Sequence, residues 1–463
     1  MTRWLTLLAF ALIAVAVFAV RPAQTPGPFL RDFEAYWSAG SAWNAGGDPY
    51  DRAIWSIERS VPNVDSSHDE MLPFVGPPAT LIFWSLLARL PYVLAARLWV
   101  ALLAVAALAL AAIAVRAANS RFWSSAFPAA IALAVAFGPV TSALALGQVA
   151  LIASLAAVAV AMPLSVPWRA AAAFVALFQP NAAFGLVSQL GRNRATIAMI
   201  LGMAATYAAG VAFLGWQWPV LYLRRLLPHD NAEHLSAIQF TPGAIAHGAG
   251  MAAPAATAVA IATAIVAVAA IVAMWRRIAD PIARFAAIAP LAPFASSFFH
   301  EHDLVVAYLA AGWCAVRTRG NVRAVALAAT LLVAIDWLGL AQRPTGILQS
   351  ALLATAAVCA FGALGEEGGW PQIATASSVL AIVFVLAAWL SSGHPVPVWP
   401  DALGAFRAAA DAPIAAVWRD EQARTGLLGV NPVWAFLRAL SLSGCALLSL
   451  SVYLQRYDVK RVQ

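Results

Sequence analysis

Apolar runs long enough to cross a membrane recur along most of this chain, as in residues 4–20, 92–115 and 253–275. A helix needs about 20 apolar residues to cross a hydrocarbon core of about 30 Å. Hydrophobic residues make up 62% of the 463 residues and charged residues only 11%, so water cannot solvate most of the chain. We therefore predict an all-α, polytopic integral membrane bundle. It would form one domain over residues 1–463, with twelve to fourteen transmembrane helices and extracytoplasmic interfacial helices.

One apolar segment is too short for a full crossing. Residues 79–90, which precede Pro91, would extend about 18 Å as a helix. The hydrocarbon core is about 30 Å thick. The helix must therefore begin earlier, near Phe74, or cross the membrane only in part.

The placement of arginine and lysine predicts the topology, because short cytoplasmic connections are enriched in these residues. If the N-terminus is inside, Arg276 and Arg277 lie at an inner helix end, and both termini are cytoplasmic. Three long loops, residues 21–73, 216–252 and 392–433, then lie on the extracytoplasmic side of a bacterial-type plasma (inner) membrane. This pattern accounts for the net charge of +7, so we expect no nucleic-acid partner.

The first long loop begins with a polar and aromatic segment, RDFEAYWSAGSAWNAGGDPYDRA, at residues 31–53. Aromatic and small residues recur every three or four positions from Phe33 to Trp43, which predicts a short amphipathic helix in the membrane interface. Asp32 is placed to cap the N-terminus of this helix, and the following Gly-Gly pair is placed to end it. A turn at DPY and a second short helix at about residues 51–60 are expected next.

Five sequence blocks follow one another along the chain. They are DFEAYWSAG with GGDPY in the first loop, then LPFVGPPATLIFWSLLARLP, GQVALIASL, FQPNAAFGLVSQL and SSFFHEHDLVVAYLA. This ordered set resembles glycosyltransferase family 87, a group of alpha-mannosyltransferase-like membrane enzymes of the C-superfamily that use polyprenyl-phosphate sugars. Some positions depart from the family pattern: Val75-Gly76 precede the double proline, Ser296-Ser297-Phe298 replace serine-proline-tyrosine, and His302 replaces a tyrosine.

The resemblance implies that a hexosyl group, with mannosyl as the expected sugar, moves from a polyprenyl-phosphate donor to a hydroxyl of a lipid or glycan acceptor at the extracytoplasmic face. The hydroxyl would attack the anomeric carbon opposite the phosphate and invert its configuration. Phosphate leaves as a stable anion, so one base and cationic stabilisation suffice. The family's base is an acidic residue just after the first span, and the matching residue here is Asp32. Glu34, on a different face of the same helix, is its competitor.

The donor phosphate needs positively charged partners near the outer interface. Arg224 and Arg225 are candidates, although such a pair can equally anchor a helix at the interface, and the sequence leaves these two roles open. Arg52 and Arg59 in the first loop and the histidines of HEHD are further candidates. The set of substrate-binding residues that we predict is Tyr36, Asp48, Tyr50, Arg52, Arg224, Arg225, His300, His302 and Asp303.

The HEHD segment also raises the question of a metal, since His-x-His with flanking acids can bind zinc or manganese. On a helix, His300 and His302 would point about 200° apart, so joint ligation requires an extended or bent backbone. The three cysteines, Cys314, Cys359 and Cys445, lie in apolar runs and have no metal-ligand spacing. We therefore expect a metal-independent site without a cofactor.

A second class of function remains open at this point. A non-catalytic or flippase-like membrane protein could handle polyprenyl-linked glycans with the same basic residues, used for binding alone. Ion-coupled carriers usually need ionisable residues or broken helices near the bilayer midplane. The apolar runs of this chain carry almost no charge, which favours the transferase.

Overall fold

The computed structural model describes residues 2–20, 29–118, 126–342, 346–365, 370–394 and 398–455, and every regular element within them is a helix. Residues 21–28 of the first loop and 395–397 of the third lie outside the described part. The long apolar helices are α1 (Thr2–Ala14, continued by the π-helix Val15–Ala19), α5 (Tyr92–Ala118), α11 (Asn193–Leu214), α14 (Ala253–Arg277), α20 (Ile347–Leu364), α21 (Trp370–Gly393) and α23 (Pro432–Leu454).

Shorter helices pack among these seven. They are α4 (Leu81–Leu87) with its 3₁₀ turn η2 (Pro78–Thr80), α6 (Ala126–Val135), α7 (Gly138–Leu146), α8 (Ala150–Ala161), α9 (Val166–Ala176), α10 (Pro180–Ala183), η3 (Phe184–Gln189), α13 (Pro242–Gly248), α15 (Pro281–Ile288), η4 (Ala289–Leu291), α16 (Ala292–Ala295), α17 (Tyr308–Arg317), α18 (Gly320–Ala334) and α19 (Trp337–Gln342). Helices α6 and α7 meet at 64° and together form an eighth candidate span. The polytopic all-α class is confirmed. The count of twelve to fourteen spans needs several of the shorter helices to cross as well, and it stays a prediction.

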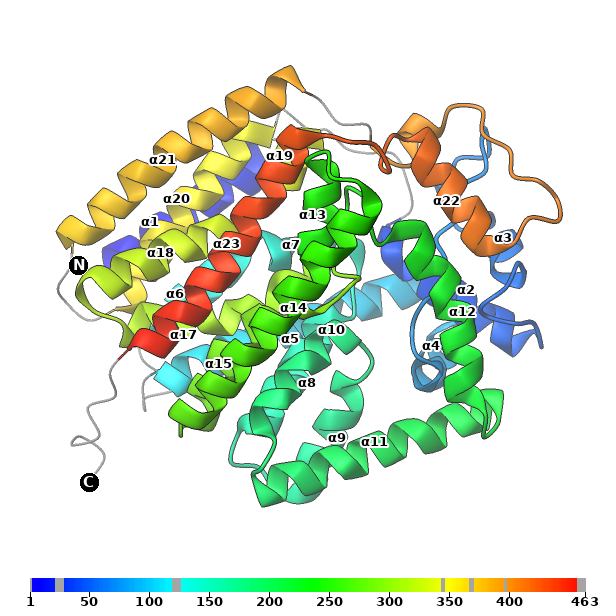
Figure 1. Cartoon of the computed structure of the whole chain (residues 1–463), viewed down its shortest axis with the longest axis horizontal. Helices are drawn as coiled ribbons and strands as arrows, with labels where there is room; N and C mark the ends of the chain where they lie inside the picture. Colours follow the sequence, from blue (N-terminus) through cyan, green and yellow to red (C-terminus); the bar gives the residue numbers. More distant parts are fainter. Residues whose placement is uncertain are drawn as a thin grey trace.

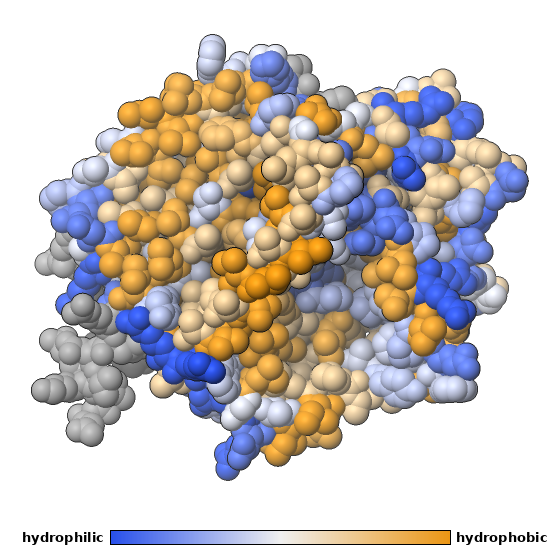
Figure 2. Space-filling view, viewed as in Figure 1, coloured by the Kyte–Doolittle hydropathy of each residue, from blue (hydrophilic) through white to orange (hydrophobic). Residues whose placement is uncertain are grey.

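Contact with lipid explains why the long helices have apolar outer surfaces. Large apolar side chains are exposed on them, including Ile200 on α11, Ile265 on α14 and Ile382 on α21. A water-soluble protein rarely exposes so wide an apolar surface. Figure 2 shows hydrophobic residues spread over α21, α23 and α14. Hydrophilic residues lie along the left and lower edges of the view and over the loop helices at its right end.

The described parts of the three long loops pack against one another at that hydrophilic end. Their helices are α2 (Arg31–Asn44), α3 (Ala53–Glu58), α12 (Trp218–Glu233) and α22 (Ile414–Arg424), followed in Figure 1 at the right of the view. Arg407 pairs with Asp69 at 3.1 Å, and the indole N–H of Trp418 donates to Glu233 at 2.7 Å. Segments more than 300 residues apart therefore form one polar region, as the predicted topology requires of loops on the same side.

The first loop folds into the two predicted helices, but the aromatic face of α2 is packed against protein. Phe33 is fully buried near Trp84 and Trp99, and Tyr36 stacks on Trp84 with 4.7 Å between ring centroids. A Cβ at Gly40 would lie 2.3 Å from the Trp84 carbonyl oxygen, so this glycine allows α2 to cross α4 closely. These aromatic residues therefore fix α2 on α4 and α5 instead of anchoring it in lipid.

The observed start of α2 and of the helix before Pro91 tests two local predictions. The N-cap prediction for Asp32 was wrong: α2 begins at Arg31, its N-cap is Leu30 with a φ of 61°, and Asp32 lies in the first turn with its carboxylate bonded elsewhere. The short apolar segment before Pro91 begins its helix only at Pro78. Of the two alternatives for that segment, the structure favours a partial crossing.

Candidate active site

A hydrogen-bonded chain joins Asp32, Gln148 and Tyr36. Asp32 and Tyr36 are one turn apart on the same face of α2. The Tyr36 hydroxyl donates to Gln148 Oε1 at 2.7 Å, and Gln148 Nε2 donates to Asp32 Oδ2 at 2.5 Å. Gln148 follows Gly147, which has a φ of 80° and whose Cβ, if present, would lie 2.9 Å from the Cβ of Phe33. Glycine is therefore required for Gln148 to reach both side chains.

A second group of hydrogen bonds holds Asp303, whose side chain is fully buried. Gln179 Nε2 donates to Oδ1 at 2.6 Å, and Asn181 Nδ2 donates to Oδ2 at 2.7 Å. The backbone N–H of His300 also donates to Oδ2, at 3.1 Å. These three donors compensate for the lost hydration of the carboxylate.

His300 is bonded to Glu233 at the end of α12. The distance between His300 Nε2 and Glu233 Oε1 is 2.6 Å, and Glu233 also accepts hydrogen bonds from Gln239 Nε2 and from the indole of Trp418, each at 2.7 Å. Burial opposes a charge on His300. The Glu233 carboxylate, with further contributions from Asp303 and Asp32, outweighs burial and raises the pKa of His300 above its ordinary value. His300 is therefore the most strongly favoured cation among the buried groups of this cluster.

His302 differs from His300 although their ring centroids are 5.2 Å apart. Burial lowers the pKa of His302, and the neighbouring His300 lowers it further, against the opposite effect of Asp303. His302 is therefore neutral near pH 7, while His300 is favoured in its charged form.

The backbone at His300 is extended, with φ −97° and ψ 170°, and the 3₁₀ helix η5 (Glu301–Ala307) follows. The condition for joint ligation is thus met: ligand atoms of His300, His302 and Asp303 lie within 4.8 Å of one another. The three residues could hold a metal ion by position. However, His300 Nε2 and both oxygens of Asp303 already take part in hydrogen bonds. A charged imidazole is also a poor ligand, because metals bind neutral histidine.

The Asp32 chain and the His300 cluster belong to one site. Burial raises the pKa of the Tyr36 phenol well above its ordinary value, and the carboxylates of Asp32 and Asp303 add to this effect. The charge of Asp32 also acts on both histidines. Five of the predicted residues, Asp32, Tyr36, His300, His302 and Asp303, are therefore brought together from segments about 270 residues apart.

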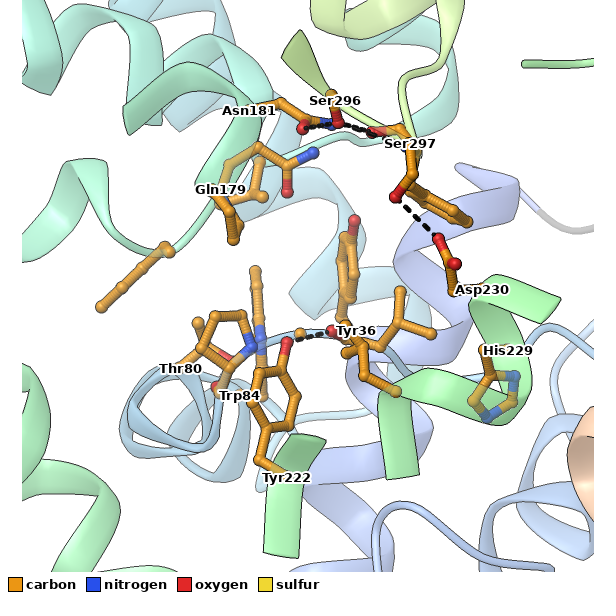
Figure 3. A pocket seen from close by; sticks show the side chains of 18 residues that line it. Tyr36, Thr80, Trp84, Gln179, Asn181, Tyr222, His229, Asp230, Ser296 and Ser297 are labelled. Carbon is orange, nitrogen blue, oxygen red and sulfur yellow. Dashed lines mark hydrogen bonds between the residues drawn. The ribbon is translucent and has the colours of Figure 1, made fainter. Parts of the chain in front are cut away.

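A cavity of about 240 Å³ lies against this site. In Figure 3, Tyr36 stands between Asn181 and Ser296 on one side and Thr80, Trp84 and Tyr222 on the other. The Ser296 hydroxyl donates to Asn181 Oδ1 at 3.2 Å, and the Ser297 hydroxyl donates to Asp230 Oδ1 at 2.9 Å. The wall combines aromatic rings with hydroxyl and amide groups, a composition suited to a small polar ligand with an apolar attachment.

Of the predicted site residues, Tyr36 is the one that lines this cavity; Asp32, His300, His302 and Asp303 lie behind its wall, and Gln179 and Asn181 of that wall bond to Asp303. The remaining predicted residues are engaged elsewhere. Arg225 pairs with Asp48 at 2.5 Å, and Arg224 is exposed on the same helix. The Tyr50 hydroxyl donates to the Gly76 carbonyl at 2.7 Å, which supports the loop before the double proline. Arg52 lies over the Trp55 ring and donates to the Ala412 carbonyl at 3.3 Å.

Glu34 faces a different environment from Asp32. It pairs with Arg31 at 3.4 Å, and Arg31 also pairs with Glu70 at 2.6 Å. Burial, only partly offset by Arg31, raises the pKa of Glu34 to about 8. Glu34 is therefore mostly protonated at neutral pH, which makes it a poor candidate for a base there.

Sequence reasoning named the blocks that contain Gln148, Gln179 and Asn181 but did not name these residues. Their signal was available, since each is an amide in a block that the resemblance picked out. Glu233 and Trp418 had no such signal, because they lie in loop segments without a recognised motif.

Comparison with known proteins gives one family. The model of glycosyltransferase family 87 matches residues 74–297, which include the cavity residues from Val75 to Ser297. No curated protein and no solved structure matches the chain significantly. Asp32 and His300 lie on either side of the matched range.

Proposed function

The chain belongs to glycosyltransferase family 87 and is a membrane glycosyltransferase, and we propose that it transfers a hexosyl group, specifically mannosyl, from a polyprenyl-phosphate donor. The acceptor is a hydroxyl of a lipid or glycan, and the reaction inverts the anomeric carbon at the extracytoplasmic face. The observation that carries the proposal is the chain from Asp32 through Gln148 to Tyr36, which ends at the cavity.

Asp32 acts as the general base in this proposal. Among the described side chains, only Gln148 donates to its carboxylate, and it uses Oδ2, which leaves Oδ1 for the acceptor hydroxyl. As the acceptor oxygen bonds to the anomeric carbon, its proton moves to Asp32. The bond between that carbon and the phosphate oxygen breaks, and the polyprenyl phosphate leaves with the bonding electrons.

The donor occupies the cavity next to Tyr36 in this proposal. Sugar hydroxyls can bond to Gln179, Asn181 and Ser296, and the first isoprene units can contact the rings of Trp84 and Phe178. His300 supplies positive charge for the phosphate, since it is favoured in its charged form and lies in the same cluster as Asp303.

A second polar cavity, of about 310 Å³, supports a separate approach for the acceptor. Arg31, His68, Glu70 and Asp401 are among its lining residues. Arg31 precedes Asp32 in α2 and lies about 140° around the helix from Tyr36. We propose that the acceptor hydroxyl reaches Asp32 from this side of α2, opposite the donor.

Replacing the base tests the catalytic assignment. We expect Asp32→Asn to lower kcat by about 10²- to 10⁴-fold, the usual contribution of a general base. Transfer from a radiolabelled polyprenyl-phosphate mannose would be measured with purified protein in detergent. Asp51→Asn, which changes an exposed carboxylate in the same loop, is the matched control and should keep its activity.

Loss of transfer in Glu34→Gln instead of Asp32→Asn would contradict the assignment. A wild-type protein that binds the lipid without transfer would support the flippase-like alternative.

Removing the positive charge at His300 tests the phosphate contact. We expect His300→Gln to raise the KM for the donor about ten- to hundredfold, because a hydrogen bond to a charged group contributes about 1.5–3 kcal/mol. Initial rates at varied donor concentration would measure this. His247→Gln removes another loop histidine, whose Nδ1 is hydrogen-bonded to the Met251 carbonyl, and should leave the KM unchanged. An unchanged donor KM in His300→Gln would remove His300 as the phosphate partner.

Chelation distinguishes a metal-independent reaction from a metal-dependent one. We expect full transfer in excess EDTA, because the donor atoms of Asp303 and His300 are already engaged in hydrogen bonds. Rates would be compared before and after dialysis against EDTA, and after addition of manganese or zinc. Loss of activity that manganese restores would instead establish the His300, His302 and Asp303 group as a metal site.

The acceptor side has its own test at Asp401, an exposed residue of the 3₁₀ helix η7 (Asp401–Leu403). We expect Asp401→Ala to raise the KM for the acceptor about three- to tenfold, the effect of one lost hydrogen bond. The KM for the donor should not change. Rates at varied concentrations of each substrate would separate the two effects, and an increase confined to the donor KM would argue against this approach.

A further inference from the structure

The segment after α21 reaches the His300 cluster through a buried hydrogen bond from Trp418. Trp418 on α22 donates its indole N–H to Glu233 Oε2 at 2.7 Å, and Glu233 Oε1 lies 2.6 Å from His300 Nε2. Glu233 and Trp418 are both buried. Neither Trp418 nor His300 falls within the residues matched by the family model, so the match alone does not predict this arrangement.

We propose that Glu233 is a positioning residue for His300 and that Trp418, which belongs to the third long loop, holds Glu233 in place. This inference rests on the proposed function, because it assigns His300 to the donor phosphate. Glu233 fixes the imidazole through Nε2, and Trp418 and Gln239 fix Glu233 through both of its oxygens. The carboxylate therefore has one orientation, and so does the histidine that it bonds.

The backbone around His300 is held by the same residues. Gln239 Nε2 donates to Glu233, and Gln239 Oε1 accepts the backbone N–H of Phe299 at 2.6 Å. The backbone N–H of Phe240 donates to the carbonyl of Phe299, also at 2.6 Å. The backbone that leads into His300 is thus hydrogen-bonded to Gln239 and Phe240, which follow α12. A change at Glu233 therefore affects the His300 ring and leaves these backbone contacts in place.

The contact between Glu233 and His300 also affects the charge of the histidine. The groups that face His300 are Glu233 from α12, Asp32 from α2, and Asp303 and His302 from η5. Asp303 is saturated by three N–H donors, and Asp32 is bonded to Gln148. Glu233 is the carboxylate in direct contact with the imidazole ring, and it is the one that keeps the imidazolium form at higher pH.

The test uses the pH dependence of kcat/KM. Without the Glu233 carboxylate the pKa of His300 falls, so its charge is lost at lower pH. In the profile of kcat/KM against pH, activity falls on the alkaline side as His300 loses its proton, and we call this fall the alkaline limb. We expect Glu233→Gln to move the alkaline limb to lower pH, with kcat/KM about tenfold or more below wild type at pH 8 but within about threefold at pH 6. Glu233→Asp, which keeps the charge, should restore the position of the limb. Trp418→Phe should shift it in the same direction by less.

Another bonded pair of a glutamate and a tryptophan in the third long loop provides the control. Glu421 is also fully buried on α22 and accepts the indole N–H of Trp399 at 2.9 Å, but it does not contact His300. Glu421→Gln and Trp399→Phe repeat the chemical changes without removing a hydrogen bond to Glu233 or His300. Because the Trp399 ring packs against Trp418, with 5.5 Å between centroids, Glu421→Gln is the cleaner control. If they shift the alkaline limb as far as Glu233→Gln does, the effect is general destabilisation and the inference is wrong. An unchanged limb in Glu233→Gln overturns it directly.

A binding measurement separates this inference from the proposed function. The affinity of detergent-solubilised protein for a polyprenyl phosphate without sugar would be measured at pH 6 and pH 8. Wild type should bind at both values, and Glu233→Gln should lose about tenfold in affinity only at pH 8. This pattern in a protein that transfers no sugar would retain the positioning role and reject the transferase. Equal pH dependence in both proteins would reject the positioning role, whatever the activity.

Discussion

The side-chain amide of Gln148 is the interaction on which the candidate site depends. Its carbonyl oxygen accepts from Tyr36 and its N–H group donates to Asp32, so one residue in the connection before α8 fixes two side chains of α2. A carboxylate half-buried at a membrane edge is costly without such a partner. Gly147 permits the approach, since any side chain there would collide with Phe33. The packing of α2 and the orientation of Asp32 are therefore set by the same few contacts.

If the site takes a phosphate donor as proposed, the negative charges of its own carboxylates must be offset. Asp32, Asp303 and Glu233 all act on His300, and three carboxylates would repel an anionic donor. The charges of Asp303 and Glu233 are stabilised by three hydrogen bonds each, and His300 balances that of Glu233. Of these three carboxylates, as far as the described side chains show, Asp32 is the one that keeps an oxygen without a bonded donor. Asp303 and Glu233 therefore have positions suited to a structural role, whereas Asp32 has an oxygen available to accept a proton.

The sequence predicted the fold class well, because a composition of 62% hydrophobic residues leaves few alternatives to a helical membrane protein. It also named Asp32, Tyr36, His300, His302 and Asp303, which the structure places near one another, although their roles stay predictions. It misjudged the N-cap because the carboxylate of Asp32 bonds to a residue 116 positions away. Glu233 and Trp418 could not be found, because a contact between two loops leaves no local pattern. Arg52 and Arg225 have structural partners in the first and third loops, which composition cannot reveal.

The position of the family match separates two parts of the site. The matched residues 74–297 supply most of the cavity wall, including Trp84, Gln179 and Asn181, which suit a sugar and its lipid. The candidate base and the charged histidine lie outside that range, and so does Trp418, which supports the histidine through Glu233. A chain with a similar matched region but a different flanking loop would keep the cavity and lose part of the electrostatics. Similarity over the central region therefore bears on the cavity wall, whereas in the proposed reaction the packing of the outer loops would set whether the donor phosphate meets a charged partner.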